Sequence, residues 1–151
     1  MKRKSIVIGF VALLLALALA AVAGAERIKG TDGPDQLNGT AGRDVIFALG
    51  GNDTVNGLEG NDRLHGGPGD DTVNGGPGDD RLWVGPGADT ENGGDGDDVL
   101  HMLAKDGQVD HADCGAGNDV IWVNAAESDV YVNCETVKTV TVTGRPAARR
   151  R

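Results

Sequence analysis

A nine-residue repeat that runs from Gly30 to His101 constrains the fold of this chain more than any other feature. The stretch divides into eight consecutive blocks, in which the fourth residue is always Gly and the sixth is always Asp. The eighth residue is apolar in seven blocks, and Glu91 is the exception. A fixed period this short predicts a solenoid, because each unit can bury its apolar side chain only against the units before and after it.

Each block contains a turn and a short strand. Its first six residues are rich in Gly, Asn, Asp and Pro, which favour tight turns, since Gly adopts positive φ without steric cost. The last three residues, such as Thr72-Val73-Asn74, are too few for a helical turn. They suit a strand whose middle side chain points inward.

The blocks resemble the calcium-binding nonapeptide GGxGxDxUx of the RTX, or hemolysin-type, family. GGPGDDTVN and GGPGDDRLW match it at every defined position, and CGAGNDVIW at 114–122 is a detached copy. The resemblance implies a parallel β-roll with Ca²⁺ held between turns. The segment after the repeats looks similar to the C-terminal caps of small secreted actinobacterial RTX proteins.

The ninth residue shows that the blocks alternate. It is Asn in every odd block and Phe, His or Trp in every even block. The structural period is therefore eighteen residues, with two turns and two strands in each coil, so that odd and even strands stack into separate sheets. We predict an all-β parallel β-roll of about four to five coils with a disulfide-linked C-terminal cap.

Stacking brings like charges together at the sixth position. Asp53 and Asp71, which are eighteen residues apart, are expected about 4.8 Å apart and would repel by roughly 3 to 4 kcal/mol at an effective dielectric near 20. Carboxylates and turn carbonyls form the hard oxygen set that Ca²⁺ prefers, so we expect about six ions in two rows. The predicted ligand pairs are Asp35/Asp53, Asp44/Asp62, Asp53/Asp71, Asp62/Asp80, Asp71/Asp89 and Asp80/Asp98, with Asp119 of the detached copy as a further ligand. Without calcium, the alternative is a disordered Gly- and Asp-rich segment.

The start of the chain predicts export. Three basic residues among the first five precede an apolar run that ends at Ala23, which is the pattern of a secretory signal peptide. We expect cleavage after Ala25, or alternatively after Ala23, while an uncleaved membrane anchor is the other interpretation. The predicted domains are a signal peptide at 1–25, the roll at 26–122 (core repeats 30–101, detached repeat 114–122), cap strands at 123–143 and a basic disordered tail at 144–151. The mature chain is expected to be extracellular, without a membrane span.

The two cysteines predict one disulfide, because paired thiols in a secreted chain are usually oxidised. Cys114 and Cys134 lie about one coil apart, so the bond would join adjacent coils. Two free buried thiols are the alternative. His111 with Cys114 has a spacing that suits a zinc site, but four ligands would require Cys134 and one more residue.

The outward residues of the even strands form a possible partner face: Phe47, Arg63, His65, Arg81, Trp83 and His101, flanked by Val45 and Val99. Aromatic side chains interleaved with arginine are typical of recognition surfaces. The alternatives are that the C-terminal segment folds back over this face or that two copies pair there.

Calcium binding coupled to folding is therefore the function that we predict, and a calcium-dependent adhesion or partner-binding module is the alternative. We expect no enzyme activity, because the chain has no Gly-x-Ser-x-Gly motif and no phosphate-binding loop. The formal net charge of −9 argues against a nucleic-acid partner.

Overall fold

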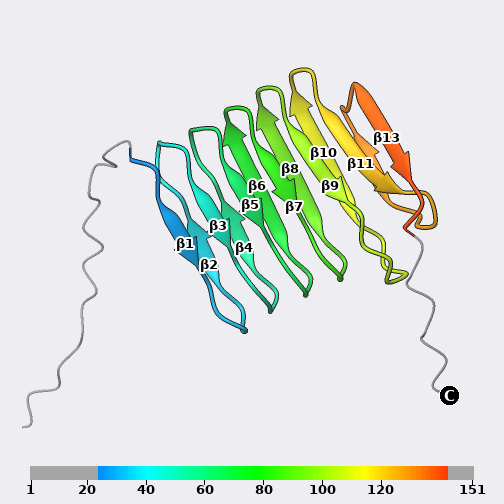
Figure 1. Ribbon diagram of the computed structural model, residues 1–151, viewed down its shortest axis with the longest axis horizontal. Coiled ribbons are helices and arrows are strands. Elements are labelled where there is room, and N and C mark those ends of the chain that lie inside the picture. The colour runs from blue at the N-terminus through cyan, green and yellow to red at the C-terminus, as the bar shows by residue number, and fades with distance from the viewer. Residues whose placement is uncertain (1–23, 143–151) are drawn as a thin grey trace, which may run out of the picture.

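The computed structural model describes residues 24–142 as an all-β parallel solenoid in which two sheets lie face to face (Figure 1). The predicted signal peptide, apart from its last two residues, and the predicted basic tail lie outside the described residues. Within the part of the chain that the structure covers, we find no helix with the length and apolar character needed to cross a bilayer.

The strands alternate strictly between the two sheets. The first sheet contains β1 (Arg27–Lys29), β3 (Val45–Phe47), β5 (Arg63–His65), β7 (Arg81–Trp83), β9 (Val99–Met102), β11 (Val120–Asn124) and β13 (Thr136–Val140). The second contains β2 (Gln36–Asn38), β4 (Thr54–Asn56), β6 (Thr72–Pro77), β8 (Thr90–Asp95), β10 (His111–Ala116) and β12 (Val130–Val132). The predicted separation of odd and even blocks is thus confirmed.

Register follows the eighteen-residue period through the repeats. Val55 pairs with Val73, and Leu64 pairs with Leu82, in parallel ladders. The solenoid has about six turns rather than the four to five that we predicted. It is longer because β1 precedes the first block and because β12 and β13 continue the sheets without the Gly and Asp signature.

The turns require glycine where the chain takes a left-handed conformation. In the six blocks from Gly51 to Gly96, the fourth-position glycine has φ between 116° and 144°. A Cβ at Gly78 would also collide with the carbonyl of Gly60 in the preceding coil. Leu49 and Leu58 occupy the second position with φ of 83° and 78°, a conformation that costs a non-glycine residue of order 1 kcal/mol.

The core is mainly one row of eighth-position side chains from each sheet, to which Ala48, Met102, Cys114 and Val123 add. The fully buried members in the repeats are Ile46, Val55, Leu64, Val73, Leu82, Leu100 and Ile121. This row is one residue wide, so packing between neighbouring coils supplies the apolar burial that the repeat pattern predicts.

The C-terminal end extends the solenoid. The β9–β10 connection is three residues longer than in the repeats, so that His111 pairs with Thr90 at a separation of twenty-one residues. Cys114 and Cys134 form the predicted disulfide, with their Cα atoms 5.2 Å apart, which rules out the zinc site. β13 pairs with β11 at the edge of the first sheet, so its residues lengthen that sheet and do not fold back over its outer face.

Candidate metal centre

The sixth-position aspartates form one hydrogen-bonded ladder along each edge of the solenoid. The Oδ1 atom of each carboxylate accepts a bond from the backbone N–H of the aspartate one coil earlier, as from Asp53 to Asp71 (2.9 Å) and from Asp62 to Asp80 (2.7 Å). All six predicted pairs are neighbours in this way. The repeat therefore fixes the Oδ1 atom of each aspartate by a hydrogen bond and leaves the Oδ2 atom available within the turn.

The second carboxylate oxygens are buried and have no hydrogen-bond partner. The unpartnered Oδ2 atoms belong to Asp53, Asp62, Asp71, Asp80, Asp89, Asp98 and Asp119. Each of these residues is at most 2% exposed. Burying an ionised oxygen without a partner costs several kcal/mol, so a row of such oxygens indicates a ligand that proteins bind through oxygen.

A backbone carbonyl lies beside the free oxygens of Asp62, Asp80 and Asp98. A Cβ placed on Gly75 would collide both with Asp80 Oδ2 and with the carbonyl oxygen of Gly93 in the next coil. The first-position Gly57 and Gly93 likewise each lie beside the Oδ2 atom of the aspartate in their own block and a carbonyl oxygen of the next coil. Glycine at the first position therefore leaves a small cradle in which oxygens from two coils converge. An all-oxygen donor set of this kind suits Ca²⁺.

A metal ion between the coils would need backbone ligands as well as carboxylates. Within residues 24–142, no three His, Cys, Asp or Glu side chains are grouped so that they alone could hold a metal ion. A cation between coils would therefore take at most two carboxylates and would rely on turn carbonyls for its other ligands, as large hard cations do.

The ladders continue past the repeats through three acids that the sequence period missed. Asp89 donates its N–H to Asp110, Asp110 donates to Asp129, and Asp119 donates to Glu135. Each of these acids stands two residues before a side chain in the inward register, like a sixth-position aspartate. A search for an acid two residues before an inward position, without the requirement for a preceding glycine turn, would have found them.

A sequence comparison agrees with this geometry. The family model described as RTX calcium-binding nonapeptide repeat (4 copies) matches residues 21–55, 29–64 and 56–91. The chain belongs to the RTX calcium-binding repeat family. Comparison with curated proteins and with solved structures gives no significant match.

The first RTX coil differs from the others. Thr31 donates from both its N–H (2.6 Å) and its hydroxyl (2.9 Å) to Asp35 Oδ2. Thr40 makes the same two bonds to Asp44 Oδ2, at 2.6 and 3.0 Å. Threonine thus satisfies at the N-terminal end the oxygen that stays free further along the roll.

Burial raises the pKa of the ladder carboxylates in the metal-free RTX roll. It raises the pKa of Asp80 to about 7, and the neighbouring Asp62 and Asp98 carboxylates add to the rise, while the bond from the Asp62 N–H opposes it. Burial likewise raises the pKa of Asp89 and Asp98 to about 7 and of Asp71 to about 6. Without a cation, these carboxylates therefore take up protons at a pH well above that at which an exposed aspartate does so.

We therefore expect opposite effects of pH on the metal-free roll and on calcium binding. Because the folded pKa values exceed the usual 3.8, their stabilising contribution is complete below about pH 4 and is lost as pH rises through 6 to 7. His65 and His101 act in the other direction, because burial lowers their pKa, but the raised carboxylates outnumber them. Calcium must displace the carboxyl protons, so its midpoint concentration should be about tenfold or more higher at pH 5.5 than at pH 7.5. Circular dichroism titrations at the two pH values measure this, and an unchanged midpoint would contradict it.

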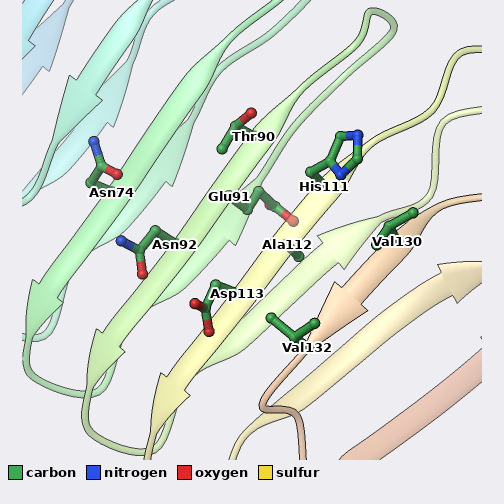
Figure 2. Close-up of a pocket in the computed structure, with 9 residues that line it drawn as sticks. All are labelled: Asn74, Thr90, Glu91, Asn92, His111, Ala112, Asp113, Val130 and Val132. Atoms are coloured by element: carbon green, nitrogen blue, oxygen red, sulfur yellow. The ribbon is translucent and has the colours of Figure 1, made fainter.

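Glu91 is a buried acid outside the ladders. Its side chain is 1% exposed, and neither carboxylate oxygen has a hydrogen-bond partner. It takes the inward position on β8, in register with Val73 of β6 and Ala112 of β10. Figure 2 shows Glu91 and Ala112 on their neighbouring strands. Burial, followed by the charges of Asp110 and Asp89, raises its pKa to about 8. It also contributes to the lining of a depression of about 340 Å³ over β6, β8, β10 and β12, which contains none of the ladder aspartates.

Replacing Glu91 with Leu should stabilise the RTX roll by about 2 kcal/mol, because an unpartnered buried carboxyl gives way to the residue type found elsewhere in this row. Denaturant unfolding at saturating calcium measures the change, and the gain should grow as pH rises through 8. Glu59→Leu, at an exposed position, serves as the control. A loss of stability in Glu91→Leu would mean that the carboxyl has a favourable partner.

The predicted partner face is a continuous column of stacked rings. Phe47, His65, Trp83 and His101 stack with centroid distances of 4.6, 4.5 and 4.9 Å, and Trp122 continues the column at 6.3 Å. Arg27 lies over Phe47 at one end, and Lys138 lies over Trp122 at the other. Arg63 and Arg81 are exposed beside the column on adjacent strands.

Proposed function

We propose that the protein binds calcium ions between its stacked turns and folds as it binds them. The observation that carries this proposal is the set of seven buried, unpartnered Oδ2 atoms, which are divided between the two aspartate ladders. RTX repeats imply calcium as the ligand. Since the cradles are assembled from two coils, a site exists only in the folded roll, and the free energy of binding becomes free energy of folding.

About six ions in two rows are the number that we propose, one between each predicted aspartate pair. Asp53, Asp62, Asp71, Asp80, Asp89 and Asp98 supply free oxygens for these sites, and Asp119 supplies one for the detached repeat. Asp35 and Asp44 are the terminal ligands of the two rows. Their Oδ2 atoms already accept bonds from threonine, so we expect the sites that they border to be the weakest.

The setting that we propose is extracellular. RTX repeat proteins are typically secreted, and the N-terminal segment 1–25 has the composition of a signal peptide. A chain with net charge −9 repels itself before calcium is bound. Export from a calcium-poor cytosol to a calcium-rich exterior would therefore allow folding at the place of use.

Counting bound ions tests the stoichiometry. Isothermal titration calorimetry of the chelator-treated chain should show about six calcium ions bound, with little heat from magnesium, because Mg²⁺ requires a smaller octahedral site and gives up water reluctantly. Equal binding of magnesium, or one to two calcium ions per chain, would contradict the proposed rows.

A partner-binding module is the second candidate, and the aromatic column favours it. RTX repeat β-rolls are typically non-catalytic, so a surface is the feature through which such a module would act. Calcium would then control the partner indirectly, because the column exists only when β3, β5, β7, β9 and β11 are stacked. Partner capture that is equal with and without calcium would contradict this second function.

A further inference from the structure

The outer face of the seven-stranded sheet concentrates positive charge on an acidic chain. Only the seventh- and ninth-position side chains of each strand point outward there, and none of them is acidic. Five are cations, and all five are exposed: Arg27, Lys29, Arg63, Arg81 and Lys138. The full chain carries a net charge of −9, so this face is complementary to an anion although the molecule as a whole is not.

The aromatic column offers ring edges rather than ring faces. His65, Trp83 and Phe47 stack with interplanar angles of 6° and 10°. Each inner ring is therefore covered on both sides by its neighbours. Ring edges carry the positive side of the aromatic quadrupole, so the column adds to the attraction for an anion and leaves no ring free to stack on a planar ligand.

We propose that this face binds a linear anionic polysaccharide that lies across the strands, with its charged groups over Arg63 and Arg81. This inference rests on the calcium-folded roll of the proposed function. Adjacent strands are about 4.8 Å apart, which is close to the length of one pyranose ring, so successive sugars meet successive strands. The guanidinium groups suit carboxylate or sulfate because they bind two oxygens at once. The face is two side-chain rows wide, which fits one polymer chain.

The same observations disfavour two other anionic partners, single-stranded nucleic acid and a lipid surface. Single-stranded nucleic acid binds proteins largely through bases stacked on free aromatic faces, and here the faces are covered. A lipid surface is held by protruding apolar side chains, but Val130, Tyr131 and Val132 lie on β12 of the other sheet. Asp79 and Asp97 border the face at the turn next to Arg81. Their negative charges would keep a polyanion on the two outward rows of side chains.

The pKa values of two histidines in the column should show whether an anion is bound to this face. Burial lowers the pKa of His65, and His101 and Arg63 lower it further. Burial also lowers the pKa of His101, Arg81 adds to this, and the bond from Nδ1 to the Leu82 carbonyl opposes it. The remaining neighbours of the two rings, Phe47, Trp83 and Trp122, carry no charge. An anion placed over the arginines should therefore raise both histidine pKa values.

The experiment measures binding of the full chain to chondroitin sulfate oligosaccharides at saturating calcium. Arg81→Gln should weaken binding about tenfold, because one charge-assisted contact is lost. Lys105→Gln removes one charge from the exposed β9–β10 connection and should change binding less than about twofold. In a histidine NMR titration, the pKa values of His65 and His101 should rise when the oligosaccharide is saturating. The NMR signals of His111, which lies on β10 of the other sheet, should not shift when the oligosaccharide is added.

Equal losses in the two variants, unchanged histidine pKa values, or tighter binding of a single-stranded oligonucleotide or of anionic phospholipid vesicles would overturn the inference. Circular dichroism of each variant in calcium separates this failure from that of the proposed function. If the chain folds with calcium but does not bind the oligosaccharide, only the polysaccharide proposal is refuted. A chain that calcium does not fold refutes the proposed function.

Discussion

Asp71→Asn should weaken calcium binding without reducing the structure of the chain in the presence of chelator. The amide oxygen of Asn can still accept the bond from the Asp53 N–H (2.9 Å in the native chain), so the ladder geometry is kept. What is lost is an anionic ligand whose Oδ2 has no protein partner. We expect the calcium midpoint for folding to rise at least about tenfold, which corresponds to about 1.4 kcal/mol. With chelator present, the variant should be no less structured than the native chain, because one of a row of like charges has been removed.

Asp95→Asn is the matched control for that variant. Asp95 is exposed at the end of β8, and the same change in charge there should leave the calcium midpoint within about twofold. Circular dichroism and thermal unfolding at several calcium concentrations measure both variants. If Asp71→Asn lowers stability equally with calcium and with chelator, Asp71 has a structural role only, and its assignment as a ligand is wrong.

Gly75→Ala should prevent the central coils from closing around an ion. The added methyl group would occupy the point where Asp80 Oδ2 and the Gly93 carbonyl converge. Neither can move aside readily, because the carbonyl is backbone and Asp80 is held by the bond from the Asp62 N–H. The backbone at Gly75 is not left-handed, so the penalty comes from lost space rather than from strained φ. We expect a loss of about 3 kcal/mol in calcium, the upper part of the range for overpacking.

Gly33→Ala tests whether the effect belongs to the cradle. The nearest neighbour of a Cβ at Gly33 is the Thr31 hydroxyl at 3.9 Å, an ordinary contact. Its effect on the free energy of unfolding should stay within about 0.5 kcal/mol. Denaturant unfolding at saturating calcium compares the two variants. Similar losses of unfolding free energy would show that the effect of Gly75→Ala does not come from the oxygen cradle.

The architecture and the aspartate ladders were predictable because the repeat is regular. Gly at the fourth position, Asp at the sixth and an apolar residue at the eighth define a turn, an edge and a core, and the alternation at the ninth position gives the two sheets. The disulfide followed from there being only two cysteines in a chain with the pattern of a secreted protein.

The parts that were missed lack that regularity. β1 carries no glycine turn, so a three-residue strand of ordinary composition gave no signal. β12 and β13 lie in the predicted cap strands at 123–143, but we did not expect them to continue the two sheets of the roll. The three-residue insertion before β10 hid Asp110 from an eighteen-residue period. The bonds of Thr31 and Thr40 to carboxylates four residues later depend on the side-chain geometry within a single turn. Trp122 has the ninth position of the detached copy, but its stacking on His101 depends on how the coils on either side of the insertion pack. A pattern in the sequence does not show such packing.

A calcium titration of the purified mature chain, followed by far-ultraviolet circular dichroism, tests the central claim most directly. Starting from chelated protein at pH 7.5, the spectrum should change cooperatively from coil to β-sheet as calcium is added, and it should return to coil when chelator is restored. A compact β-sheet spectrum that is already present in chelator and gains no thermal stability from calcium would contradict the account.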